Sequence, residues 1–272
     1  AARCEGWQQR PNPLALGRSL KHAPFSILYK YVARRFAERG YHVVLADTRG
    51  HHQGQPDQVM PHHNEVTDGE ATLAWLIRQP WFDGTLGMWG ASFLGYAQWA
   101  VATAPLPEAV RRLAIVPATT ATNWHGMFHP DGIPATDAFL RLKYLSGTLQ
   151  LGFLPRLIAL ARQEKVVVPL LDGRPATEGL ARLPPVTGFD FDRLMATPDA
   201  GAGIWRSADT GRKIEFDRTA IHLVAGWYDI FLRDQIADYL ALRAKGANLS
   251  MTIGAWHHTS QDLGPETIRA AL

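Results

Sequence analysis

Short apolar runs alternate with longer amphipathic stretches along the first 118 residues of the chain. Continuous apolar runs are typical of strands buried on both faces of a parallel sheet, and apolar positions three or four residues apart are typical of helices packed on it. The predicted strands are residues 41–46, 85–89 and 113–116, and the predicted helices are residues 26–39, 67–79 and 96–103. This alternation predicts an α/β fold with a doubly wound, mostly parallel sheet.

Two of these helices carry start signals. The first is predicted to begin at a Ser26 cap and to end at Gly40, and Thr67 with Glu70 forms a capping box ahead of the second. The apolar face expected of the first helix consists of Leu28, Tyr31, Val32 and Phe36.

The pattern changes after Pro117. Residues 119–214 hold helical pieces broken by proline and glycine, and they show no alternating strands. The alternation then returns with a strand at 220–225, a helix at 231–245 and a strand at 249–253. The residues in register on one face of that helix are Ile236, Tyr239, Leu240 and Arg243. We therefore predict three segments, namely the first part of the sheet domain at 1–118, an inserted helical cap at 119–214 and the second part of the sheet domain at 215–272.

A serine stands at the corner between the predicted strand at 85–89 and the helix that follows it. Gly90 lies two residues before Ser92 and Gly95 lies three residues after it, so small residues surround the turn. A nucleophilic serine at the carboxyl edge of a sheet needs such a strained and uncrowded turn. The spacing G-x-S-x-x-G differs from the commoner G-x-S-x-G, and a serine in a glycine-rich corner is more often a helix cap, so the motif needs partners elsewhere.

Two such partners follow the last two predicted strands. Asp229 comes after the strand at 220–225 and His258 after the strand at 249–253, which places both at the same sheet edge as Ser92. Acyl transfer by serine needs a histidine that takes the hydroxyl proton and a carboxylate that orients the histidine. The order Ser92, Asp229, His258 is the order of the α/β-hydrolase fold, and it predicts a catalytic triad.

Four stretches extend this pattern beyond the three residues. They read Gly-Tyr-His-Val-Val-Leu-Ala-Asp-Thr-Arg-Gly at 40–50, Gly-Met-Trp-Gly-Ala-Ser-Phe-Leu-Gly at 87–95, Gly-Trp-Tyr-Asp-Ile-Phe at 226–231 and Gly-Ala-Trp-His-His at 254–258. Together they resemble the cocaine esterase and X-Pro dipeptidyl-peptidase family of serine hydrolases. The resemblance extends from about residue 26 to the end of the chain, more loosely over the predicted cap, and it implies an α/β-hydrolase fold.

The resemblance also assigns roles to individual residues. It implies Ser92 as the nucleophile, Asp229 as the acid and His258 as the base. It selects His258 over His257 because the family histidine lies two residues after the tryptophan. The backbone N–H of Phe93, the residue after the serine, is then one donor of the oxyanion hole.

The chain departs from the family pattern at the second oxyanion donor and at its flanks. The family has a tyrosine hydroxyl in a Pro-Tyr-Gly turn, where this chain reads Ala-Leu-Gly-Arg at 15–18. Leu16 has no side-chain donor, so a backbone N–H near Leu16 or Gly17 substitutes, another residue does so, or activity is reduced. Family members also carry strands before this turn and a β-sandwich after the last helix. We expect a trimmed core or a natural short form, because the sequence holds neither.

The composition excludes several partners. Of 272 residues 46% are hydrophobic, the net charge is +3, and Lys and Arg are scattered, so no basic stripe suggests nucleic acid. No apolar run approaches the length of a membrane span, and no signal peptide is visible. The single cysteine, Cys4, permits no internal disulfide and no thiolate metal cluster, which slightly favours the cytoplasm without fixing the compartment.

Other polar and aromatic residues have two interpretations each. His125 and His129 are spaced for one helical turn, but Gly126 and Pro130 disfavour a regular helix, so we predict no metal site. Trp124, Phe128 and Phe139 form either an apolar substrate pocket or the seam between cap and sheet.

Asp47 and Arg49 follow the first predicted strand, where they contact substrate or, as we expect, fix their own loop through an ion pair. Neither residue enters the predicted triad.

The sequence thus predicts a serine hydrolase that cleaves a carboxylic ester, or an amide, through an acyl-enzyme on Ser92, with no cofactor and a small-molecule substrate. Two alternatives stay open. One is an X-Pro dipeptidyl-peptidase-like or acyl-transferring serine enzyme, and the other is a non-catalytic binding protein with a hydrolase fold. The sequence indicates neither the acyl and leaving groups nor the oligomeric state.

Overall fold

The computed structural model of the chain describes residues 23–46, 64–148, 151, 153–173, 175–186, 189–211, 214, 217–258, 260 and 267–269. These residues fall into two compact units. One unit holds the described parts of 1–56 together with 136–192, and the other holds those of 57–135 together with 193–272. The sheet and all three predicted triad residues belong to the second unit.

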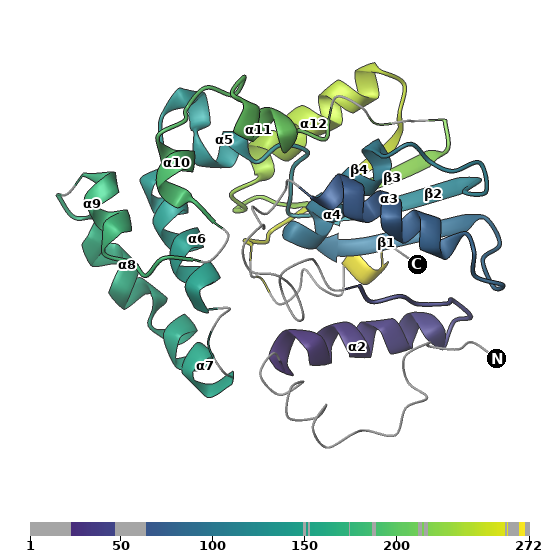
Figure 1. Cartoon of the computed structure of the whole chain (residues 1–272), viewed down its shortest axis with the longest axis horizontal. Coiled ribbons are helices and arrows are strands. Elements are labelled where there is room, and N and C mark those ends of the chain that lie inside the picture. Colours follow the sequence, from purple (N-terminus) through teal and green to yellow (C-terminus); the bar gives the residue numbers. More distant parts are fainter. Residues whose placement is uncertain are drawn as a thin grey trace. The chain divides into compact units, whose positions relative to one another are not determined.

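A four-stranded parallel sheet forms the centre of this second unit (Figure 1). Its strands lie in the order β1-β2-β3-β4 and comprise β1 (Thr85–Ala91), β2 (Arg112–Ala118), β3 (Thr219–Gly226) and β4 (Asn248–Gly254). The strands predicted at 85–89, 113–116, 220–225 and 249–253 are therefore confirmed. Because all four run in the same direction, their carboxyl ends meet at one edge of the sheet.

Three helices pack on one face of this sheet, namely α3 (Glu65–Leu76), α4 (Phe93–Thr103) and α12 (Leu232–Ala244). Each contributes to a single apolar cluster that also contains alternate residues of β2 and β3. The cluster includes Leu73, Trp99, Leu113, Ile115, Ile221, Leu223 and Leu242. Alternate strand residues share a face, so the elbow helix α4 and the helix α12 after the predicted acid are anchored to the same side of the sheet.

The strand predicted at 41–46 is wrong. These residues follow helix α2 (Ala23–Ala37) and Gly40, whose φ of +95° matches the predicted helix stop, but they belong to no strand. Val44 and Leu45 are exposed. A strand exists only through backbone hydrogen bonds to a neighbour, and residues 41–46 make no such pairing within the described residues.

Three details of the predicted helices also need correction. Helix α2 begins before Ser26, and Tyr31 on its expected apolar face is exposed. Helix α3 begins directly after Asn64, so Thr67 lies inside the helix, where its hydroxyl donates to the carbonyl of Asn64 at 2.9 Å instead of forming a capping box.

Helix α12 buries a face that only partly agrees with the predicted one, since Tyr239 packs against the core cluster. Gln235 and Leu242 are buried, whereas Leu240 is 60% exposed. The apolar pattern misled the prediction because a polar residue, Gln235, occupies a position that faces the sheet.

The segment between β2 and β3 is helical, as predicted. It comprises α5 (His125–Phe128), the 3-10 turn η2 (Pro130–Gly132), α6 (Thr136–Thr148), α7 (Phe153–Ala161), α8 (Gln163–Leu171), α9 (Ala176–Ala181), α10 (Phe191–Met195) and α11 (Gly203–Ser207). Helices α6 to α9 lie in the first compact unit, whereas 119–135 and 193–214 group with the sheet. This division follows contacts between residues and does not test the segment boundaries predicted at 118 and 214, which stay a prediction.

Buried polar contacts hold α6 to its neighbours within the first unit. The ammonium of Lys143 donates to the carbonyl of Leu180 at 2.9 Å, and the hydroxyl of Tyr144 donates to the carbonyl of Ala159 at 2.8 Å.

Among the described residues of the chain, no helix has the length and apolar character needed to cross a bilayer.

Candidate active site

Ser92 lies in a strained turn between β1 and α4. Its φ of +57° and ψ of −125° form a conformation that residues with a side chain rarely adopt, and its backbone N–H donates to the carbonyl of Ala118 at 2.9 Å. A Cβ atom at Gly95 would lie 2.5 Å from the methyl group of Thr120, and one at Gly90 would lie 2.6 Å from the Cβ of Leu94. The small residues at both positions are therefore a steric requirement of the corner, as predicted for a nucleophile elbow.

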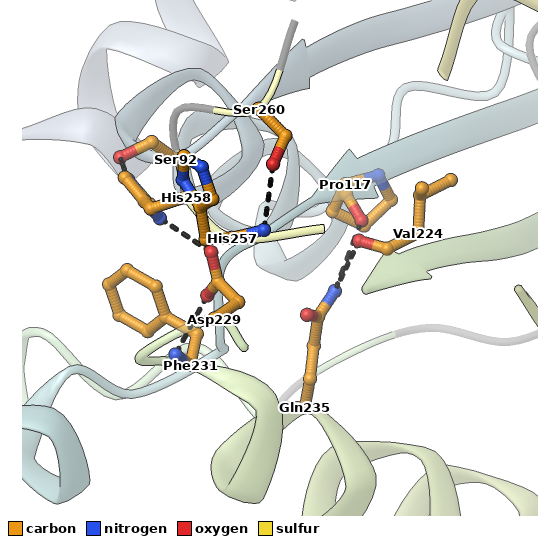
Figure 2. Close-up of polar contacts among 9 residues, drawn as sticks. All are labelled: Ser92, Pro117, Val224, Asp229, Phe231, Gln235, His257, His258 and Ser260. Atoms are coloured by element: carbon orange, nitrogen blue, oxygen red, sulfur yellow. Dashed lines mark hydrogen bonds and ion pairs between the residues drawn. The ribbon is translucent and has the colours of Figure 1, made fainter. Parts of the chain in front are cut away.

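The three side chains predicted as a triad lie in one hydrogen-bonded row (Figure 2). Nε2 of His258 is 3.0 Å from Oγ of Ser92, and Nδ1 of His258 is 2.8 Å from Oδ2 of Asp229. A histidine that donates its Nδ1–H to a carboxylate presents Nε2 as an acceptor for the serine hydroxyl. The arrangement is therefore capable of moving the serine proton to the imidazole.

Asp229 is held in place by its own loop. The side chain is fully buried, and its second oxygen, Oδ1, accepts the backbone N–H of Phe231 at 2.8 Å. The backbone N–H of Asp229 donates to the carbonyl of Gly226 at 3.1 Å. Both carboxylate oxygens are thus engaged, and the carboxylate has one orientation relative to His258.

Backbone hydrogen bonds join the loop that carries Asp229 to the loop that carries His258. The N–H of Trp227 donates to the carbonyl of Gly254 at 2.9 Å, and the N–H of Tyr228 donates to the carbonyl of Trp256 at 3.0 Å. A Cβ atom at Gly226 would clash with the backbone of Trp256, and one at Gly254 would meet its ring. The Gly-Trp-Tyr-Asp and Gly-x-Trp-x-His stretches therefore encode the close approach of these two loops.

The neighbouring histidine lies elsewhere. His257 is exposed, and its backbone N–H donates to the hydroxyl of Ser260 at 2.8 Å. His258, with 27% of its side chain exposed, is the histidine that contacts both Ser92 and Asp229.

Phe93 is the first residue of α4, directly after the serine. The first N–H groups of a helix have no intrahelical acceptor and carry the positive end of the helix dipole, which suits an oxyanion donor. Leu16 and Gly17, where the second donor was expected, lie outside the described residues, as do Cys4, Asp47 and Arg49.

An aromatic row leads from the predicted substrate residues to the histidine. The ring of Trp124 lies 6.0 Å from that of Tyr96 and 5.1 Å from that of Phe231, and Phe231 lies 5.7 Å from His258. Phe128 is buried, with its ring 5.7 Å from that of Trp205. The sequence reasoning missed Phe231 as a site residue, although it ends the quoted Gly-Trp-Tyr-Asp-Ile-Phe stretch.

His125 and His129 contact backbone carbonyls. Their rings are stacked at 5.2 Å, and their Nε2 atoms lie 2.8 Å from the carbonyl of Pro198 and 2.9 Å from that of Leu194, respectively. Burial, the larger cause, and the nearby His125 lower the pKa of His129. Within the described part of the chain, no three His, Cys, Asp or Glu side chains are grouped to hold a metal ion.

The sequence pattern did not predict two polar side chains near the site, the buried Gln98 and the half-buried Asp238. The amide of Gln98 accepts from the N–H of Val116 at 2.8 Å and donates to the carbonyl of Gly90 at 3.1 Å. The carboxyl of Asp238 accepts from the N–H and the hydroxyl of Thr122. Burial raises the pKa of Asp238 to about 7, and the hydrogen bonds from Thr122 only partly oppose this effect.

Comparisons with known proteins agree with the sequence pattern. The profile of a family described as X-Pro dipeptidyl-peptidase (S15 family) matches residues 6–260. A cocaine esterase from Rhodococcus sp. (strain MB1 Bresler) is 28% identical over 240 residues, which are 83% of this chain and 40% of that protein. This chain therefore spans about two fifths of the length of that relative.

Solved structures give a weaker likeness. A CocE/NonD family hydrolase from Staphylococcus aureus is 16% identical with a TM-score of 0.49, over 82% of this chain and 33% of that one. A monoacylglycerol lipase from Paleococcus ferrophilus is 17% identical with a TM-score of 0.48, over 90% of this chain and 87% of that one. The relationship of this chain to known proteins thus rests on the sequence matches.

Proposed function

This chain belongs to the X-Pro dipeptidyl-peptidase (S15) family, and on that premise we propose that it is a serine hydrolase that cleaves carboxylic esters through an acyl-enzyme. The single observation that carries the proposal is the row of Ser92, His258 and Asp229, with contacts of 3.0 and 2.8 Å, at a strained corner. Three residue types far apart in the sequence meet in the geometry that the reaction needs.

In the first half of the reaction, Oγ of Ser92 attacks the carbonyl carbon while Nε2 of His258 takes the hydroxyl proton. Asp229 stabilises the imidazolium that forms, because its buried carboxylate accepts the Nδ1–H at 2.8 Å. The tetrahedral oxyanion accepts the N–H of Phe93. The imidazolium then gives its proton to the departing alkoxide, the ester C–O bond breaks, and the acyl group stays on Ser92.

In the second half, water replaces the alcohol. His258 takes a proton from water, the resulting hydroxide attacks the acyl carbon, and the bond to Oγ breaks as His258 returns the proton to Ser92. The products are a carboxylic acid and an alcohol, and the enzyme is regenerated without a cofactor.

Trp124 and Phe231 form the wall of the acyl pocket in this proposal. Trp124 is buried, and the row of rings ends at His258, beside the reacting atoms. An apolar wall suits an aromatic or branched acyl group rather than a charged one. The sequence match to a cocaine esterase supports ester cleavage, and the family description supports testing a proline peptide beside it.

Labelling with a fluorophosphonate, read by intact mass, tests the proposal. We expect one adduct on the wild type and none on Ser92→Ala. A wild-type protein that is folded but unlabelled would overturn the proposal and favour a non-catalytic binding protein.

Substrate assays then separate the enzyme classes. p-Nitrophenyl benzoate and acetate report esterase activity, and an X-Pro p-nitroanilide reports dipeptidyl-peptidase activity. An added amine that captures the acyl group reports acyl transfer. We expect ester hydrolysis to exceed anilide hydrolysis, and the reverse order would replace the esterase proposal by a peptidase.

A further inference from the structure

The central strand β2 contains a proline close to the site. Pro117 has no N–H, so it cannot donate to the neighbouring strand, and proline is rare in a strand that has partners on both sides. The paired residues of β2 and β3 include Leu113 with Thr219 and Ala118 with Val224, but none for Val116 or Pro117. The ladder between β2 and β3 is therefore interrupted just before both strands end at the site.

Gln235 lies at this interruption. Its side-chain NH₂ donates to the carbonyl of Val224 in β3 at 3.1 Å and, more weakly, to that of Pro117 in β2 at 3.5 Å (Figure 2). The residue is 0% exposed, and its Oε1 has no hydrogen-bond partner among the described residues. The donor end of the amide is thus the end in use. It adds a second hydrogen bond to the carbonyl of Val224, which also accepts the backbone N–H of Thr119 at 2.8 Å.

Gln235 also closes the loop that holds the predicted acid. It lies in the first turn of α12, where its backbone N–H donates to the carbonyl of Phe231 at 2.8 Å. Phe231 in turn donates its N–H to Oδ1 of Asp229. The chain leaves the sheet after Gly226 and passes Asp229, and the side chain of Gln235 then ties it back to the carbonyl of Val224 in β3.

We propose that Gln235 is a positioning residue for the reaction, acting through Asp229 by fixing both ends of the loop on the sheet. The inference rests on the proposed function, because it assigns Gln235 a role in the triad chemistry. Without the side-chain amide of Gln235, the start of α12 loses its hydrogen bond to the carbonyl of Val224 in β3. The carboxylate of Asp229 is then held less firmly in its orientation beside His258.

The test is a double-mutant cycle with Gln235→Met, which keeps the side-chain length and removes the donors. Gln235→Met, Asp229→Ala and the double variant are compared with the wild type. The measurements are the second-order rate of fluorophosphonate labelling and the kcat and KM for p-nitrophenyl acetate. We expect Gln235→Met to lower kcat and the labelling rate roughly 10- to 100-fold, with KM changed by less than about twofold.

In the Asp229→Ala background the same substitution is expected to change either rate by less than about twofold, because the group it positions is already absent. Equal losses in both backgrounds would mean a general structural role and overturn the inference. Wild-type rates in Gln235→Met would also overturn it. An unlabelled wild type would overturn the proposed function and this inference with it, so the two failures are distinguishable.

Leu242→Ala is the matched control for stability. Leu242 is buried on the same helix and lies in the core cluster, away from the loop. A similar fall in thermal midpoint without the loss of kcat is expected. A second variant, Gln235→Glu, keeps the shape but replaces the donor by an acceptor, and it is expected to lose activity as Gln235→Met does.

Discussion

The carboxyl of Asp238 accepts two hydrogen bonds from Thr122, one from the backbone N–H at 2.8 Å and one from the hydroxyl at 2.6 Å. Thr122 in turn accepts both the N–H and the hydroxyl of Thr210 at its carbonyl. Helix α12, the segment after β2 and the segment after α11 are therefore joined through one residue. Trp124 follows Thr122 by two positions, so this junction also helps to hold the ring of Trp124 against Tyr96 and Phe231.

The protein is expected to lose stability as the pH rises from about 4 to about 7 because of Asp238. Burial raises its pKa to about 7, above the unfolded value of about 3.9, and Asp234 and Asp209 add like charge nearby. A raised pKa contributes stability that is fully present below about pH 4 and is lost as the pH rises through 7. Between pH 5 and pH 8.5, urea unfolding of the wild type is expected to show a fall of about 2–4 kcal/mol in the free energy of unfolding. Asp238→Asn is expected not to show this fall. An equal pH dependence in both proteins would assign the effect to other groups.

Ser92→Gly is expected to be more stable than Ser92→Ala, although both are inactive. The φ of +57° strains any residue that carries a Cβ, and glycine removes that strain. We expect a gain of about 1 kcal/mol in the free energy of unfolding, since glycine also loses more backbone entropy on folding. Equal unfolding midpoints for the two variants would show that the corner is relaxed.

Gly95→Ala is expected to destabilise the protein by about 1–3 kcal/mol, although alanine usually favours a helix. The new methyl group would lie 2.5 Å from the methyl of Thr120. The clash is also expected to shift the serine corner and to lower the rate of fluorophosphonate labelling. Thr120→Ser removes that methyl, so the double variant is expected to recover part of the lost stability and part of the lost labelling rate. A destabilisation that Thr120→Ser does not reduce would point to another clash.

Trp124→Ala is expected to change the choice of acyl group. Its loss opens the wall beside Phe231, so kcat/KM for p-nitrophenyl benzoate is expected to fall roughly 10-fold relative to the acetate. Phe128→Leu serves as the control, because Phe128 packs against Trp205. A benzoate to acetate ratio that changes equally in both variants would mean that Trp124 is a packing residue and no part of the pocket.

The parts of the fold that the sequence predicted are those encoded by local patterns. The four strands follow from continuous apolar runs, and the corner at Ser92 follows from two glycines with steric reasons to be small. The segment at 41–46 has an equally good apolar pattern, yet a strand also needs a neighbour to pair with, which no local pattern reports. The capping box at Thr67 failed for a related reason, since helix α3 begins before it.

The supporting residues were harder to predict than the triad. Ser92, Asp229 and His258 stand in recognisable stretches, whereas Gln235 and Asp238 contribute through contacts with backbone groups distant in sequence. Polar residues on the sheet-facing side of a helix also disrupt the apolar periodicity, which is why the face predicted for α12 included the exposed Leu240 and omitted the buried Gln235. Two features of the sequence could have indicated Gln235. One is its position one turn into the helix that follows the loop of Asp229, and the other is Pro117 in the central strand β2.

The backbone hydrogen bonds that join the loops of Asp229 and His258 have a consequence for how the site responds to heat. Because these loops are tied at Trp227 and Tyr228, backbone hydrogen bonds join the acid and the base directly, whereas the backbone N–H of Ser92 is bonded to Ala118 at the end of β2. We therefore expect thermal motion to vary the distance between Ser92 and His258 more than the distance between His258 and Asp229. On warming, the serine contact is expected to break first, so that inactivation precedes the loss of the acid–base pair.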